Sequence, residues 1–248
     1  MSTLAYIILF TLLGSVFSLI GGIILVYKKK LVLKISHFLA SFAAGTLLGA
    51  AFFDLLPEAL NEGEIQTILF WVLAGILVFF LLERFIHWFH HHHEHLHKET
   101  PPTIPLVIFG DSVHNFIDGV AIAATFLTSI PLGIVTTLAV ATHEIPQEIG
   151  DFGILLHRGL AKKKVLFFNF ASALTALLGA IATFLLGEAL ANILPTLLAI
   201  TAGFFIYIAA SDLIPEIHHE NRRGFAFIES MLLLIGVLTI GLLVSVLE

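Results

Sequence analysis

The chain has 248 residues, of which 58% are hydrophobic and 12% are charged, and its mean hydropathy is +1.01. Soluble domains carry roughly 25% charged residues, so this composition excludes an ordinary soluble protein and predicts an integral membrane protein. The formal net charge of −6 says little about partners. The sequence has no cysteine, which excludes disulfides and thiolate metal sites.

Apolar runs bounded by charged or turn residues predict an all-α membrane protein with eight transmembrane helices, forming a single domain over residues 1–248. The expected spans cover residues 4–27, 35–59, 65–89, 104–128, 131–157, 164–187, 193–217 and 225–247. Each is long enough, because about 20 apolar residues cross a bilayer. The first run, MSTLAYIILFTLLG, lacks the basic start and cleavage site of a signal peptide, so we expect it to remain as the first span.

The positions of the basic residues predict the orientation. All 12 Lys and Arg residues fall within residues 28–34, 84–98, 158–164 and 222–223. In an eight-span topology these are alternate connections on one side of the membrane, while the opposite connections carry acids. The positive-inside rule then places both termini outside and the basic connections in the cytoplasm, and we expect the cell membrane as the location.

Two parts of the sequence resemble each other. Residues 43–59 read AAGTLLGAAFFDLLPEA and residues 202–217 read AGFFIYIAASDLIPEI. Both share an Ala-Gly pair and the ending Asp-Leu-x-Pro-Glu, at Asp54–Glu58 and Asp212–Glu216. They fall on spans 2 and 7, which cross in opposite directions, so we expect spans 1–3 and 6–8 to form an inverted repeat around spans 4 and 5. Such repeats are common in transporters, with the substrate near the midplane.

Spans 4 and 5 carry polar residues in helical register. The set in span 4 consists of Asp111, His114, Asn115 and Asp118, which share one helix face. The set in span 5 consists of His143, Gln147 and Asp151, with Glu144 and Glu148 on the adjacent row. Ionisable groups at this depth are costly when they face lipid, so we expect them to face the interior of the bundle. Asp111 and Asp151 are the weaker candidates, since both lie near the cytoplasmic ends.

A divalent cation would compensate this stripe. Imidazole and carboxylate ligands without sulfur suit Zn²⁺, Fe²⁺ and Mn²⁺, and also admit Cd²⁺. Pro146 is expected to open or kink span 5 beside His143, and Pro57 and Pro215 to do the same in spans 2 and 7. The alternative is a hydrogen-bonded network that fixes helix packing without an ion.

At HNFIDG (114–119) and HEIPQEIGD (143–151) the sequence resembles the ZIP (zinc–iron permease) family of divalent-metal transporters, in particular the branch with His-Glu-x-Pro-His-Glu-x-Gly-Asp. The resemblance covers nearly the whole chain. It implies one metal site formed by His114, Asp118, His143 and position 147, with Asn115 and Glu144 contributing to an adjoining site. Glu148 matches the motif as a ligand or proton carrier.

Two positions depart from the family pattern. The second histidine of the branch motif is Gln147 here, and an amide is a poorer Zn²⁺ ligand than imidazole. Some family members also place an acidic ligand on span 6, where this chain offers only Asn169 and Ser172 as polar substitutes.

Three further polar groups lie near the predicted membrane surfaces. A His-rich cytoplasmic loop is expected at about residues 87–101, beginning HWFHHHHEHLH, either as a metal-capture or sensing loop or as a solvated loop with incidental metal affinity. The end of span 7 offers an exit group of Glu216, His218, His219 and Glu220. The outer mouth offers Asp54, Glu58, Glu62 and Glu64.

These features predict a transporter, not an enzyme, that carries divalent metal ions into the cytoplasm, Zn²⁺ first and Fe²⁺, Mn²⁺ or Cd²⁺ as further candidates. No prosthetic group and no nucleic-acid partner are expected; the lipid bilayer is a partner, and a homodimer is kept open. The alternatives are a proton or cation channel and a membrane-embedded zinc-dependent hydrolase. The HEIPQ segment lacks the second histidine of His-Glu-x-x-His zinc proteases, which weighs against the hydrolase.

Overall fold

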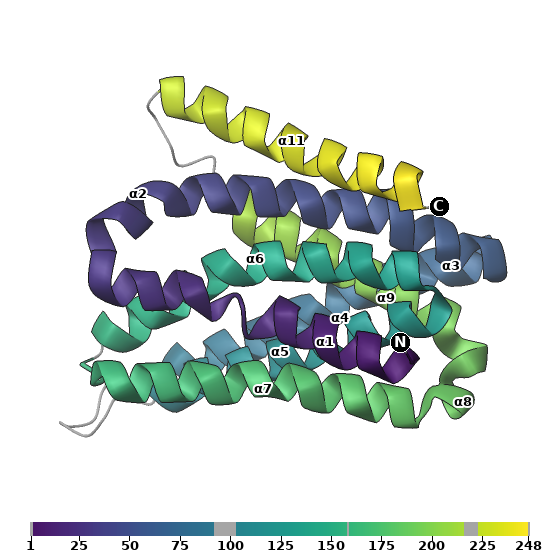
Figure 1. Cartoon of the computed structure of the whole chain (residues 1–248), viewed down its shortest axis with the longest axis horizontal. Helices are drawn as coiled ribbons and strands as arrows, with labels where there is room; N and C mark the ends of the chain where they lie inside the picture. Colours follow the sequence, from purple (N-terminus) through teal and green to yellow (C-terminus); the bar gives the residue numbers. More distant parts are fainter. Residues whose placement is uncertain (1, 92–102, 158, 216–222, 248) are drawn as a thin grey trace.

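The computed structural model describes residues 2–91, 103–157, 159–215 and 223–247, and this part of the chain is helical, without a β-strand (Figure 1). The all-α prediction is therefore confirmed. The helices are α1 (Thr3–Ser15), α2 (Leu19–Ala50), α3 (Leu56–Glu62), α4 (Ile65–His91), α5 (Thr103–Thr128), α6 (Ile130–His157), α7 (Lys162–Leu185), α8 (Gly187–Leu190), α9 (Leu194–Tyr207) and α11 (Arg223–Leu247). A 3₁₀ turn, η2 (Ala191–Ile193), and two π-helical segments, η1 (Ala51–Leu55) and η3 (Ile208–Leu213), connect them.

Most of the long helices are apolar enough to cross a bilayer. Among the described residues, seven helical stretches have the required length and hydropathy, which makes the chain an integral multi-pass membrane protein. The fifth predicted span, residues 131–157, corresponds to α6, which has 28 residues but is not one of the seven. The polar residues between His143 and Asp151 lower its hydropathy, so composition alone does not identify α6 as a span.

The first predicted span is broken. Helix α1 ends at Ser15 and α2 begins at Leu19, so a short turn interrupts the run that the sequence presents as continuous. The backbone leaves helical geometry a second time inside α2, at Lys28, where φ is −132° and ψ is 51°. The part of α2 before Lys28 thus completes the first apolar stretch, and the chain then reverses into the second (Figure 1).

Pro57 and Pro215 lie just after the two π-helical segments, where the helix is wider. A proline ring clashes with the carbonyl four residues earlier, and for Pro57 and Pro215 these carbonyls belong to Phe53 and Ser211, which lie within η1 and η3. The wider π-helical turn relieves this clash. The predicted opening at Pro146 is different, because α6 continues through that residue as a helix.

Glycines allow close helix crossings at two places. Helix α2 packs along α11, and a Cβ built at Gly236 would lie only 3.1 Å from the Cα of Gly45. Helix α9 packs along α4, and a Cβ built at Gly203 would lie 3.1 Å from the Cα of Gly75. Side chains at these positions would push the backbones apart, which is why small residues are typical of membrane helix interfaces.

Helices α5 and α6 lie in the middle of the bundle. Helix α5 contacts α6, α7, α1 and α9, and α6 contacts α1, α2 and α7, so both are enclosed by other helices. Both termini lie at the end of the bundle where α3 and α8 are found, opposite the reversal at Lys28 (Figure 1). The predicted His-rich loop begins as helix, since α4 extends to His91; the rest of that loop and the exit group at residues 216–220 lie outside the described residues.

Candidate metal site

Helix α5 places an imidazole and a carboxylate on its buried face. His114 is 9% exposed and Asp118 is 3% exposed, one helical turn apart. The Nε2 atom of His114 lies 3.6 Å from Oδ2 of Asp118. The i, i+4 spacing that the sequence predicts to align these two side chains therefore brings them together.

Helix α6 supplies the second imidazole and a second carboxylate. His143 is 1% exposed, and its Nδ1 lies 3.1 Å from the backbone carbonyl of Ala139. A carbonyl oxygen can only accept, so Nδ1 carries the proton and Nε2 keeps its lone pair. This is the tautomer that a metal-ligating histidine needs. The adjacent Glu144 is fully buried.

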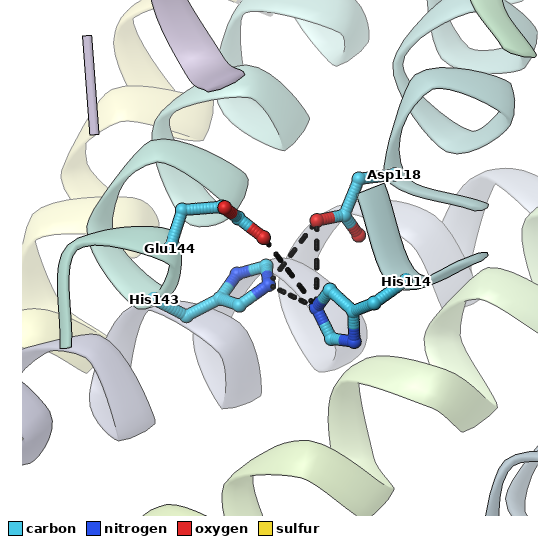
Figure 2. Close-up of side chains that lie close together, drawn as sticks. All are labelled: His114, Asp118, His143 and Glu144. Atoms are coloured by element: carbon cyan, nitrogen blue, oxygen red, sulfur yellow. Dashed lines mark hydrogen bonds and ion pairs between the residues drawn. The ribbon is translucent and has the colours of Figure 1, made fainter. Parts of the chain in front are cut away.

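The four side chains converge on one point (Figure 2). The two Nε2 atoms of His114 and His143 are 3.2 Å apart, and Nε2 of His143 lies 3.4 Å from Oδ2 of Asp118. Oε1 of Glu144 lies 3.6 Å from Nε2 of His114. One donor atom from each of the four residues falls within 4.8 Å of all the others.

These separations match the dimensions of a coordination sphere. Zn²⁺ holds nitrogen and oxygen ligands at about 2.0–2.2 Å, so donor atoms around a tetrahedral ion lie roughly 3.3–3.5 Å apart. The four separations given above lie between 3.2 and 3.6 Å. The spacing of these four pairs is the one expected around a tetrahedral divalent ion.

Two phenylalanine rings cover the imidazoles. The ring of Phe79 from α4 meets His114 edge-on at a centroid distance of 5.5 Å, and the ring of Phe205 from α9 lies 6.1 Å from that of His143. Both phenylalanines are buried. The rings restrict imidazole rotation and exclude water from these sides. The sequence does not single them out, because nothing distinguishes Phe79 or Phe205 among the 23 phenylalanines of the chain.

The remaining predicted site residues surround this cluster. Asn115 is fully buried and donates through Nδ2 to the Asp111 carboxylate at 2.9 Å, while its Oδ1 accepts no hydrogen bond within the described part of the chain. Glu148 is fully buried, and neither of its oxygens accepts a hydrogen bond from the described residues. Gln147 is half-buried, one turn after His143. The structure thus places Glu144 beside His114 and His143, whereas the family resemblance assigned it to the adjoining site.

Polar residues of α7 extend the same interior. Asn169 and Ser172 are each 1% exposed, and Ser172 Oγ accepts from Ser112 Oγ of α5 at 3.3 Å. Asp111 is 6% exposed, and Asp151 is half-buried. The two polar residues that the sequence offered in place of a span 6 acid therefore face the interior of the bundle.

The charge balance of this region favours a cation. The buried carboxylates of Asp118, Glu144 and Glu148 lie in a stretch, residues 99–157, that contains no lysine or arginine. Buried carboxylates are costly unless a cation or hydrogen bonds compensate them. Helices α5 and α6 therefore supply no lysine or arginine charge to balance these carboxyl groups.

Comparison with known proteins identifies the family of this chain. The family model described as ZIP Zinc transporter matches residues 2–105 and 91–244. The chain belongs to the ZIP zinc transporter family. Its family is one of transporters and not of enzymes, as predicted, and the hydrolase alternative is therefore set aside.

Several ZIP proteins align with this chain. The chain is 38% identical to human zinc transporter ZIP6 over 150 residues, which cover 58% of this chain and 20% of ZIP6. It is 41% identical to mouse ZIP4 over 148 residues, covering 58% of this chain and 22% of ZIP4. It is 35% identical to ZIP13 of Pongo abelii over 229 residues, covering 82% of this chain and 65% of ZIP13. The chain thus spans less than two thirds of the length of these relatives.

Proposed function

We propose that this chain is a membrane carrier for divalent transition-metal ions, Zn²⁺ first and Fe²⁺, Mn²⁺ or Cd²⁺ as further substrates, which it moves into the cytoplasm. The observation that carries the proposal is the group of four buried donor atoms, two from α5 and two from α6, within 4.8 Å of one another. His114, Asp118, His143 and Glu144 would bind the ion in transit, with Asn115, Gln147 and Glu148 beside them.

The hydrogen-bonded network without an ion explains this geometry less well. Because Nδ1 of His143 is the donor to Ala139, the two facing Nε2 atoms share a single proton from His114. That one hydrogen bond leaves the oxygens of Glu148 and Oδ1 of Asn115 without donors from the described residues. A divalent cation and its water ligands would satisfy these acceptors together.

The proposal includes an eight-span topology with an inverted repeat. The inverted repeat is supported by the glycines at the two helix crossings, which pack against the partner helix in the same way in both. A Cβ at Gly45 would meet the carbonyl of Leu233, three residues before Gly236, and a Cβ at Gly203 would meet the carbonyl of Val72, three residues before Gly75.

The π-helical segments support the same relation. In each half the aspartate lies nine residues after the crossing glycine, Asp54 after Gly45 and Asp212 after Gly203, and each aspartate falls inside a π-helical segment. Inverted halves that surround a central site provide two alternative ways of opening it, one to each side of the membrane. The basic connections between the spans favour a cytoplasmic location for residues 28–34 and both termini outside.

Transport into liposomes tests the proposal. The full chain is reconstituted with a metal-sensitive dye inside, and uptake of Zn²⁺, Fe²⁺, Mn²⁺ and Cd²⁺ is recorded. We expect saturable uptake that falls to the level of empty liposomes in the His114→Ala/His143→Ala variant. The control is Thr125→Val, which removes a buried hydroxyl of α5 that bonds only its own helix, to the carbonyls of Ala121 and Ile122. A folded protein that transports none of the four metals would contradict the proposal.

A further inference from the structure

A groove opens on the outer surface of the bundle, away from the metal site. It has a volume of about 390 Å³ and lies between the start of α2, the end of α6 and the start of α7. Its lining residues are Leu19, Ile23, Phe152, Leu166, Phe167 and Phe170, together with Lys163. Cavities that hold small organic ligands typically measure roughly 300–1,000 Å³, so the groove is large enough for part of one.

The floor of the groove depends on a glycine, Gly22, which has no side chain to fill the space. Phe152 of α6 is fully buried, and a Cβ at Gly22 of α2 would lie 2.5 Å from its Cε2 atom. Because Gly22 has no side chain, the ring of Phe152 packs directly against the α2 backbone. The groove lies above this ring. The rim consists of apolar side chains that face outward: Phe167 is 64% exposed and Phe170 is 45% exposed. On a membrane protein such side chains face lipid chains.

One end of the groove is positively charged. Helix α7 begins with Lys162, Lys163 and Lys164, all three exposed, and Lys163 is itself a lining residue. The Nζ atom of Lys162 lies 3.4 Å from the carbonyl of Val26, just before the break in α2. This contact ties the start of α7 to α2 and occupies one of the three ammonium groups.

The start of α7 adds to this charge. Its N-cap residue, Ala161, has no side-chain acceptor for the first-turn N–H groups. The positive end of the helix dipole therefore faces the same place as the lysines. Phe170 lies seven residues after Lys163, which is about 10 Å along the helix. An anion held at Lys163 would thus sit at the membrane surface, with the apolar groove directly below it in the bilayer.

We propose that the groove between α2, α6 and α7 binds one anionic phospholipid, with its phosphate at Lys163 and the α7 N-terminus and an acyl chain against the exposed rings of Phe167 and Phe170. The charge of the mouth selects the headgroup, and the apolar floor accepts the chain. Bound there, the lipid would brace α7 against the broken first span and the end of α6. This role is independent of metal binding at His114 and His143.

Native mass spectrometry of the purified full chain tests the assignment. The protein in detergent is titrated with phosphatidylglycerol or with phosphatidylcholine carrying the same acyl chains. We expect one phosphatidylglycerol to be retained in preference to phosphatidylcholine. Lys163→Ala should weaken that retention about fivefold, the effect of one basic residue near a lipid surface. Arg84→Ala, which removes the same charge from an exposed site on α4, should leave it unchanged.

A second pair of variants tests the apolar part. Phe167→Ala/Phe170→Ala keeps every charge and should lower retention of both lipids, whereas Leu178→Ala, at a 63% exposed position of the same helix, should not. Equal retention of both lipids by the unaltered protein, or equal losses from Lys163→Ala and Arg84→Ala, would overturn the proposal. So would a dimer that disappears in the Phe167→Ala/Phe170→Ala variant, because the groove would then belong to a second copy of the chain.

Discussion

The two π-helical segments have the same motif and the same local structure, but their surroundings differ. Each carries an aspartate and is followed by proline and glutamate. Asp54 in η1 is 2% exposed, whereas Asp212 in η3 is exposed. In both segments the widened turn accompanies the proline, because the clash of Pro57 or Pro215 with the carbonyl four residues earlier is local. Burial of the aspartate depends on what packs against the turn, and the motif carries no information about that.

The neighbours of the two segments explain the difference. Segment η1 contacts α2, α3, α6, α9 and α11, while η3 contacts α2 and α9 among the described helices. Near η3, Tyr207 donates a hydrogen bond to Glu83 of α4 at 2.5 Å. The same motif thus has its aspartate enclosed in one segment and exposed in the other.

The largest expected effect comes from the glycines at the two helix crossings, Gly45 and Gly203. Gly45→Val and Gly203→Val should each destabilise the protein by about 3 kcal/mol, because the new side chain meets backbone that cannot move aside. Unfolding of the protein in detergent, followed by circular dichroism, measures this loss. Gly150→Ala in α6 is the control, since a Cβ there meets nothing within 4 Å. If only one of the two substitutions lowered the stability, the two crossings would not be equivalent.

Accessibility tests the difference between the aspartates directly. The chain has no cysteine, so Asp54→Cys and Asp212→Cys each introduce a single thiol. A water-soluble maleimide should modify the second thiol at least roughly tenfold faster, because reaction requires an exposed thiolate. Equal rates in the folded protein would show that the two ends are equally open. Slow reaction at both positions would mean that Asp212 faces lipid instead of water.

Helices α5 and α6 can also be compared, through the pair of residues that each presents to the candidate metal site. Helix α5 presents His114 and Asp118 at i, i+4, and α6 presents His143 and Gln147 at the same spacing. Gln147→His should raise the affinity for Zn²⁺ roughly tenfold, since imidazole is the better ligand. Isothermal titration calorimetry measures the change. Gln66→His, at an exposed position of α4, is the control, and an unchanged affinity for Gln147→His would place position 147 away from the ion.

The smallest expected effect concerns the contact beside η3. Tyr207→Phe removes the hydrogen bond to Glu83 and should lower the free energy of unfolding by about 1 kcal/mol. The melting temperature in detergent reports the loss. Tyr6→Phe serves for comparison, because the ring of Tyr6 keeps its stacking on Phe10 and Phe126 after the change. If both variants melt like the unaltered protein, the contact does not hold α4 to α9.

Much of the fold could be predicted from hydropathy. The expected spans at 104–128 and 131–157 differ by one residue at most from α5 and α6. The spacing of His114, Asp118, His143 and Glu144 also predicted which faces would be polar. The break between α1 and α2 was not predicted, because Val16–Ser18 continues an apolar run without proline or charge. The sequence also did not predict that α6 continues as a helix through Pro146.

Periodicity and composition by themselves determined the membrane setting, the helices and the polar faces, because these depend on residues close together in the chain. The tertiary structure alone decided that Glu144 joins the imidazoles, that Phe79 and Phe205 cover them, and that Asp54 is buried while Asp212 is exposed. Each of these depends on contacts between helices distant in sequence. Such contacts are set by how closely backbones approach at crossings such as Gly45–Gly236, and helix periodicity does not contain that distance.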